Sequence, residues 1–384
     1  MPQLKSMFLG PILLFGAALF SIGLPTMAET TTANVQGTSN DTKPDDPILL
    51  NQIQLIGSHN SFKKSIDSTL LFILDLFDSN LAAGLDYSHL PLTDQLQLGL
   101  RSLELDVYYD PNGGLYSEPF GSGLGPFSSD YDDDEIMKNS GFKVLHVQDI
   151  DYRSHCLTLR KCLEQIRHWS NENPQHIPLI ITMNPKDQVI DQTGFEPPFA
   201  FSVDAWESLD AELTEMLSKH IVTPDDIRGS HRTLKESILA GWPTVDSLRG
   251  KILFVLDAPE SKSLDYVADH PELTGRVMFV NLPEESSMAS FRIVNDPVSD
   301  LDYIKSLVST GFIVRTRADE NTIESRTGDN TRLKAAINSG AQVIATDYYQ
   351  MDTRHGTSFE VKLREQRLFR CNDLLMADTC RLQE

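Results

Sequence analysis

Residues 53–61 read Ile-Gln-Leu-Ile-Gly-Ser-His-Asn-Ser, a short apolar run followed by a tight polar turn. Runs this short and this rich in Ile, Val and Leu are typical of strands that are buried on both faces of a parallel sheet. Seven similar runs follow, at 103–107, 144–147, 179–183, 252–256, 277–280, 312–314 and 343–345. The sequence therefore predicts repeated buried strands, each of which leads into a polar residue.

Amphipathic stretches lie between these runs, for example at 159–169, 206–217 and 301–308. Their apolar residues recur at three- and four-residue steps, which is the period of a helix. Eight strands that alternate with helices predict an α/β fold, a (β/α)8 TIM-type barrel. The alternative is an open doubly wound sheet, but no G-x-G-x-x-G motif follows the first strand.

The N-terminal region has the pattern of a secretory signal peptide. Lys5 is the only charged residue before Glu29, an apolar run follows it, and small residues end at Ala28. We therefore expect a signal peptide at 1–28, a disordered lead-in at 29–46, and a secreted or periplasmic protein. An uncleaved membrane anchor is the alternative.

The remaining chain, 47–384, is expected to form a single catalytic barrel with a long loop at about 108–142 after the second strand, where glycine and acidic residues gather. Its four cysteines are Cys156, Cys162, Cys371 and Cys380. An even number in an exported chain predicts disulfides, and the short separations favour Cys156–Cys162 and Cys371–Cys380. Metal binding is the competing interpretation, but no C-x-x-C spacing is present.

The charge of the chain excludes some partners. Lys and Arg number 33 against 55 Asp and Glu, so the formal net charge is −22. Nucleic-acid binding requires a positive face, and adsorption to anionic lipid by charge alone is disfavoured as well. The sequence gives no sign of an obligate protein partner.

Ionisable residues sit where a barrel carries its chemistry, at the carboxyl ends of the strands. Glu104 and Asp106 are two apart on one predicted strand, so both project from the same face. Two buried carboxylates repel each other, and a divalent cation relieves that repulsion. Oxygen ligands without thiolates favour Ca²⁺ or Mg²⁺. His59 and His146 follow two other strands and suit acid–base chemistry near neutral pH.

These motifs together resemble one family. Residues 57–62, Gly-Ser-His-Asn-Ser-Phe, resemble the S-H-N-[ST]-[YF] start of the catalytic barrel in calcium-dependent, phosphoinositide-specific phospholipases C. Residues 99–106, Gly-Leu-Arg-Ser-Leu-Glu-Leu-Asp, are similar to the family's G-x-R-x-[VL]-E-L-D, and His146 stands where the family keeps its second histidine. The similarity is greatest to an exported microbial subgroup, whose segment before the E-L-D strand and cysteine-containing tail are also similar.

The resemblance implies a calcium site. Asn60, Glu104 and Asp106 would ligate Ca²⁺. The eukaryotic enzymes carry a further Glu ligand after the fourth strand, where this chain has Asn184. Asn184 offers a carbonyl oxygen without charge, so either calcium affinity falls or another oxygen, from Asp187, Asp257 or the acidic loop, completes the site.

The resemblance also implies a reaction at a membrane surface with a phospholipid substrate. The inositol 2-hydroxyl would attack phosphorus with Glu104 as candidate base, His59 would stabilise the transition state, and His146 would protonate the leaving glycerol oxygen. Lys186 and Arg101 would bind the substrate. The products would be diacylglycerol and a (cyclic) inositol phosphate. The apolar run 70–77 is the candidate lip for contact with lipid, with an ordinary buried helix as its alternative.

Two other functions stay open from the sequence. A metal-dependent glycerophosphodiester phosphodiesterase also uses two histidines and an E-x-D pair, but its first motif is usually H-R-G, whereas Asn60 follows His59 here. An exported barrel that binds a lipid head group without catalysis would not need both histidines.

Overall fold

The computed structural model describes residues 47–124, 131–132, 134–377 and 379–383. The predicted signal peptide and lead-in at 1–46 lie outside these residues. None of the helices in the described ranges is both long enough and apolar enough to span a bilayer.

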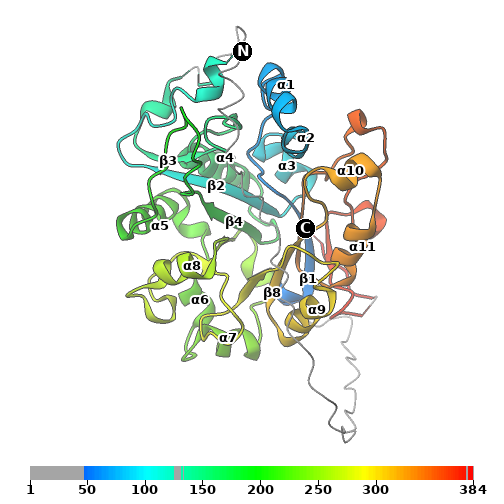
Figure 1. The fold of residues 1–384 in the computed structure, drawn as a ribbon. Helices are drawn as coiled ribbons and strands as arrows, with labels where there is room; N and C mark the ends of the chain where they lie inside the picture. The colour runs from blue at the N-terminus through cyan, green and yellow to red at the C-terminus, as the bar shows by residue number, and fades with distance from the viewer. Residues whose placement is uncertain (1–46, 125–130, 133, 378, 384) are drawn as a thin grey trace, which may run out of the picture.

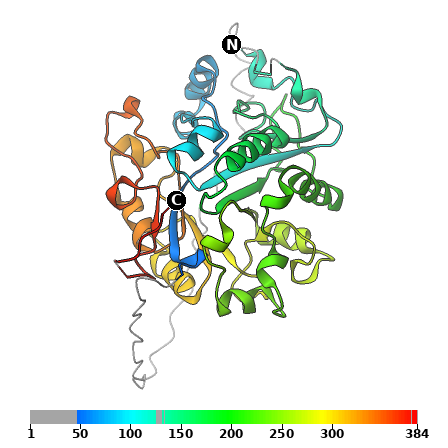
Figure 2. The ribbon, with the colours of Figure 1, turned by 180° about the vertical axis from the view of Figure 1, so that it is seen from behind.

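Eight parallel strands form a nearly closed barrel, with the helices on its outside (Figures 1 and 2). The strands are β1 (Ile53–Ser58), β2 (Ser102–Asp110), β4 (Leu179–Pro185), β5 (Ile252–Leu256), β6 (Phe279–Val280), β7 (Phe291–Ile293), β8 (Ile313–Arg317) and β9 (Val343–Thr346). They pair in the order β6-β5-β4-β2-β1-β9-β8-β7, and a bridge from Asn281 to Phe291 links β6 to β7. The (β/α)8 prediction is therefore confirmed.

The helices between these strands are short and mostly amphipathic. They are α1 (Ser68–Phe77), α2 (Ser79–Leu85), α3 (Leu92–Leu98), α4 (Leu159–Glu172), α5 (Val203–Leu217), α6 (Pro224–Arg228), α7 (Leu234–Ala240), α8 (Glu260–Val267), α9 (Leu301–Thr310), α10 (Ile323–Thr327) and α11 (Thr331–Asn338). Side-chain caps fix several starts: Asp67 accepts from two backbone N–H groups of α1, and Thr158 from one of α4. The apolar stripe of α4 is buried against the barrel, as its period predicts.

One predicted strand is wrong and one barrel strand was missed. The run at 144–147 is not a barrel strand. Val144, the first residue of this run, is the last residue of β3 (Gly141–Val144), which pairs antiparallel with the end of β2. The strand that completes the barrel is β7, only three residues long and interrupted by Arg292, so its sequence carries no distinct apolar run.

Gly57 allows β1 and β2 to approach closely. A Cβ atom at Gly57 would lie 2.6 Å from the Cβ of Ser102, its partner in the parallel register. Any side chain there would push the strands apart, because such a contact is far inside van der Waals distance. The close approach places the turn after β1 directly beside the carboxylates of β2.

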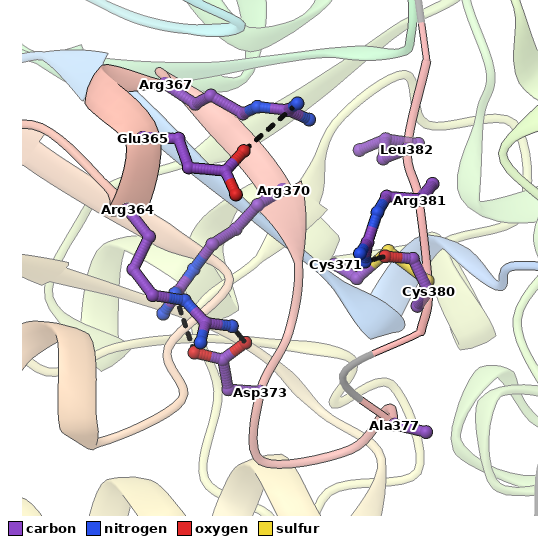
Figure 3. Close-up of a pocket in the computed structure, with 10 residues that line it drawn as sticks. All are labelled: Arg364, Glu365, Arg367, Arg370, Cys371, Asp373, Ala377, Cys380, Arg381 and Leu382. Atoms are coloured by element: carbon purple, nitrogen blue, oxygen red, sulfur yellow. Dashed lines mark hydrogen bonds and ion pairs between the residues drawn. A yellow bond between two sulfur atoms is a disulfide. The ribbon is translucent and has the colours of Figure 1, made fainter.

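Both predicted disulfides, Cys156–Cys162 and Cys371–Cys380, are present. The second one lies in the tail, next to β10 (Phe369–Cys371), which pairs antiparallel with the start of β1. Arg364 and Arg370 converge there on Asp373, each at 2.6 Å (Figure 3). This arginine-lined pocket is at the amino end of the barrel strands, away from the carboxyl ends where a barrel carries its chemistry.

Candidate active site

The turn after β1 is held between two neighbouring strands. The Ser61 N–H donates to the carbonyl of Glu104 at 3.0 Å, and the Glu104 N–H donates to Ser61 Oγ at 2.7 Å. On the other side, the His59 N–H donates to the carbonyl of Thr346 on β9 at 3.0 Å. Asn60 has φ of 49°, in the left-handed region that asparagine tolerates better than most residues. This turn therefore sets His59 and Asn60 rigidly at the carboxyl end of the barrel.

His59 is oriented by a carboxylate and an arginine. Its Nδ1 lies 2.9 Å from Asp347 Oδ1, and its Nε2 lies 3.3 Å from Arg317 Nη1. A carboxylate accepts and an arginine donates, so the proton of His59 is on Nδ1 and its Nε2 accepts a hydrogen bond from Arg317. Burial, followed by the Arg317 charge, lowers the pKa of His59 to about 4.

Asp347 is the anion of this arrangement. Burial acts to raise the pKa of Asp347, but the electrostatic attraction and hydrogen bond of His59, the hydrogen bond of His89 and the Arg317 charge hold it far below its ordinary value. Arg317 Nη2 is 3.3 Å from Asp347 Oδ2. His59 is therefore neutral and fixed beside a permanent ion pair.

His146 follows β3 and has a carboxylate partner of its own. Its Nδ1 lies 2.7 Å from Oδ2 of Asp151, which is fully buried. The backbone of the two residues is also joined, because the His146 N–H donates to the Asp151 carbonyl at 3.2 Å. Tyr87 lies between the two histidines, with its ring centroid 6.2 Å from that of His59 and 6.3 Å from that of His146. The structure thus brings together the two histidines that the sequence singled out.

Glu104 and Asp106 both face this site from β2, and each is paired with a cation. Arg315 on β8 contacts Glu104 Oε2, and Lys186, just after β4, lies 3.1 Å from Asp106 Oδ2. Burial acts to raise the pKa of Glu104, but the charge of Arg315 and weaker ones outweigh it and lower the pKa. For Asp106 burial prevails over Lys186, and the pKa is raised.

The donor set fits a hard divalent cation. No three His, Cys, Asp or Glu side chains in the described ranges form a ready-made metal cluster. However, Asp106 is completely buried, its Oδ1 accepts no hydrogen bond from the described residues, and Lys186 is the cation beside its Oδ2. Asn184 pairs with Asp106 across the β2–β4 ladder, and Asn60 lies in the turn next to β2. These oxygens are of the kind that Ca²⁺ prefers.

Asp257, directly after β5, belongs to the same group of charges. Its Oδ2 is 3.7 Å from Arg315 Nη1. Burial raises the pKa of Asp257 to about 6, with Arg315 opposing and Glu104 and Asp106 adding to the rise. Asp257 is therefore close enough to both acidic residues of β2 to be a fifth candidate ligand for a cation.

Arg101 is not part of the site, and its assignment to substrate binding is wrong. It precedes β2, at the amino end of the barrel, and is 2 % exposed. Its Nη1 donates to the carbonyls of Leu96 and Leu100 at 2.8 and 2.7 Å, and its guanidinium lies 4.9 Å from the Trp169 ring centre. Arg101 therefore ties the end of α3 to α4 and does not pair with Glu104 or Asp106.

Several site residues carried too little signal in the sequence. From the sequence, Arg315 and Asp347 could be recognised only as polar residues after apolar runs, which indicates no specific role. Arg317 lies two residues after Arg315. Asp151 gave no signal at all. Its role depends on the turn 147–151, which folds back so that the carboxylate reaches His146.

The chain is similar to a known protein family. The family model described as "Phosphoinositide phospholipase C, Ca2+-dependent" matches residues 48–373. The chain belongs to this family. It shares the TIM-barrel scaffold of solved structures.

Solved phospholipases C share the fold. Calcium-dependent phosphoinositol-specific phospholipase C from a Gram-negative bacterium, Pseudomonas sp, matches with a TM-score of 0.52 and 15% identity over 84% of this chain and 95% of that one. Its myoinositol complex matches with a TM-score of 0.51 and 16% identity, over 85% of this chain and 96% of that one. Two uncharacterized proteins from Mycobacterium tuberculosis strains are 30% identical to this chain over 154 residues, which is 39% of this chain. That match spans only 25% of the length of the mycobacterial proteins.

Proposed function

We propose that this chain is an exported, calcium-dependent enzyme that cleaves phosphatidylinositol-type phospholipids to diacylglycerol and a cyclic inositol phosphate. One observation carries the proposal: His59 and His146 flank Tyr87, each bound through Nδ1 to a buried carboxylate, beside Glu104 and Asp106. The Pseudomonas relative described with myoinositol supports an inositol head group. The two disulfides support export, because such bonds persist in oxidising compartments.

The histidines would divide the proton chemistry. The inositol 2-hydroxyl attacks phosphorus within one molecule, which is entropically favourable, and Glu104, held ionised by Arg315, accepts its proton. His146 then gives its Nε2 proton to the glycerol oxygen as the P–O bond breaks. Arg317 would stabilise the negative charge that develops on the phosphoryl oxygens, and His59, which accepts a hydrogen bond from it, would contribute by positioning Arg317.

Asn60, Glu104 and Asp106, with Asn184 or Asp257, would hold calcium, which when bound supplies positive charge for the phosphodiester oxygens. Lys186 is partly exposed next to Asp106 and is placed to contact the inositol or its phosphate.

Exposed apolar side chains support action at a membrane surface. Phe72 and Leu76 on α1 are 61% and 67% exposed and are four residues apart, so they share one face of the helix. Val189, Phe199 and Val203 are also exposed, and they follow β4 in the same way that α1 follows β1. Connections that follow parallel strands leave from the same end of a barrel, which is the end that holds the site. These side chains would enter the lipid while the acidic surface stays in water.

The experiment is hydrolysis of phosphatidylinositol vesicles and of glycerophosphoinositol, with calcium and then with excess chelator. We expect lipid cleavage that depends on calcium and exceeds cleavage of the soluble diester. Cleavage that persists in full with chelator would contradict the calcium requirement, and preference for the soluble diester would contradict the lipid substrate.

A further inference from the structure

A fully buried lysine, Lys63, lies just behind the catalytic turn and has no part in the chemistry described above. Its Nζ is 2.9 Å from the carbonyl of Leu85, 2.8 Å from that of Tyr87, and 3.2 Å from Oδ2 of Asp151. Three oxygens around one nitrogen are the surroundings of an ammonium ion. A buried ammonium without such partners would be strongly destabilising.

The Asp151 carboxylate oxygen that contacts Lys63 also contacts the general acid. Oδ2 lies between Lys63 Nζ and His146 Nδ1, at 3.2 and 2.7 Å. Oδ1 is buried and accepts no hydrogen bond from the described residues, so the stabilisation of this anion is concentrated on Oδ2. Without the lysine charge, the buried carboxylate would more readily take up a proton. A protonated Asp151 would donate to Nδ1, so His146 would then hold its only proton on Nε2 as a neutral imidazole, which is a far weaker acid than an imidazolium.

Lys63 also fixes the segment that separates the two histidines. Its Nζ holds the backbone of Leu85 and Tyr87 and lies 4.4 Å from the centre of the Tyr87 ring. The Tyr87 hydroxyl accepts a hydrogen bond from Asn60 Nδ2 at 2.7 Å. The Lys63 ammonium therefore contacts both Asp151, the partner of His146, and Tyr87, whose hydroxyl accepts a hydrogen bond from Asn60.

We propose that Lys63 is a positioning residue: its charge holds Asp151 as the anion that pairs with a doubly protonated His146, whose Nδ1–H points to Asp151 and whose Nε2–H is directed to the leaving group. The inference rests on the proposed function, in which His146 is the general acid. It is distinct from a purely structural role, in which Lys63 would only stabilise the fold.

The test uses Lys63→Met and two substrates that differ in their need for an acid. Phosphatidylinositol releases an alkoxide that must be protonated, whereas an inositol 4-nitrophenyl phosphate releases a stable phenolate. We expect turnover of phosphatidylinositol to fall about 10²-fold and turnover of the nitrophenyl ester to change by less than about 3-fold. Asp151→Asn should show the same pattern. Lys63→Met combined with Asp151→Asn should be no slower than Asp151→Asn alone, because the two residues act in one path.

The matched control is Lys143→Met. Lys143 is equally buried and lies 3.3 Å from Asp110, a carboxylate that has no histidine partner. This variant should lose stability in the same way but slow both substrates to the same extent. If Lys63→Met fails to fold, Lys63→Gln, which keeps donors for the two carbonyls but carries no charge, serves for the comparison.

A second readout does not depend on turnover. In ¹⁵N spectra of histidine-labelled protein, both ring nitrogens of His146 should carry a proton in the wild type, and Lys63→Met should shift the Nδ1 resonance toward that of an unprotonated nitrogen. Equal losses on both substrates, or unchanged His146 resonances, would overturn the proposal. If the wild type cleaved neither substrate, the proposed function would fail, while the ¹⁵N spectra would still decide the role of Lys63.

Discussion

Replacing Arg315 with methionine should leave Glu104 as a buried anion without its main partner. The side chains of Arg315 and Glu104 are 5% and 4% exposed, so solvent hardly screens the pair. Removing one member of such a buried pair costs about 3–5 kcal/mol. For about 340 folded residues, an unfolding entropy of about 2.1 cal/mol/K per residue sums to about 0.7 kcal/mol/K. The expected fall in melting temperature is therefore about 4–7 °C.

Calcium should restore much of this loss, because the ion would bring positive charge to the same carboxylate. A ligand present at 100 times its Kd stabilises the folded state by about 2.7 kcal/mol, which corresponds to about 4 °C here. Differential scanning fluorimetry with calcium and with chelator measures both effects. Arg276→Met is the control, since Arg276 is also buried and pairs with Glu207 and Asp210 at 2.9 and 3.2 Å, outside the site. An equal calcium response in the two variants would refute the reasoning.

Four further substitutions test separate parts of the site and of the fold. His59→Ala and His146→Ala should each lower turnover of phosphatidylinositol by about 10²–10⁴-fold with unchanged melting behaviour, and wild-type rates in both would contradict the site. Burial, and next the charge of Asp347, raises the pKa of Asp319 to about 7, so the stability of the wild type should decline as pH rises from about 4 to 7. Asp319→Asn should remove about 4 kcal/mol of that decline, as measured by urea titrations. Parallel curves of stability against pH for the two proteins would contradict the prediction. Arg101→Met should lower stability by a few kcal/mol and leave the KM for lipid unchanged, whereas a raised KM in a well-folded variant would return Arg101 to the binding site.

The barrel was predictable because seven of its strands lie in continuous apolar runs of the sequence. β7 shows no such run because Arg292 interrupts it. The run at 144–147 was misread because β3 is also buried, between β2 and the α4 region. Burial alone does not distinguish an antiparallel hairpin strand from a parallel barrel strand, so the number of strands was right while one member was not.

The candidate site was predictable where its chemistry is local in sequence. His59 and Asn60 lie in one turn, and Glu104 and Asp106 lie on one strand. The partners that orient them are remote: Asp347 meets His59 across 288 positions, and Arg315 meets Glu104 across 211. Arg101 was predicted to bind substrate because it is close in sequence to Glu104 and Asp106. It precedes the strand, however, and therefore lies at the amino end of the barrel, away from the site. Pairings of this kind are set by topology, which a single sequence does not specify.

The measurement that tests the central claim most directly is a ³¹P NMR time course of phosphatidylinositol vesicles incubated with the enzyme and calcium. Attack by the inositol 2-hydroxyl, with His146 as acid, predicts that the signal of a five-membered cyclic phosphodiester appears first and that an inositol monophosphate follows from it. A monophosphate that forms from the start, with no cyclic species in either the wild type or slowed variants, would contradict the account.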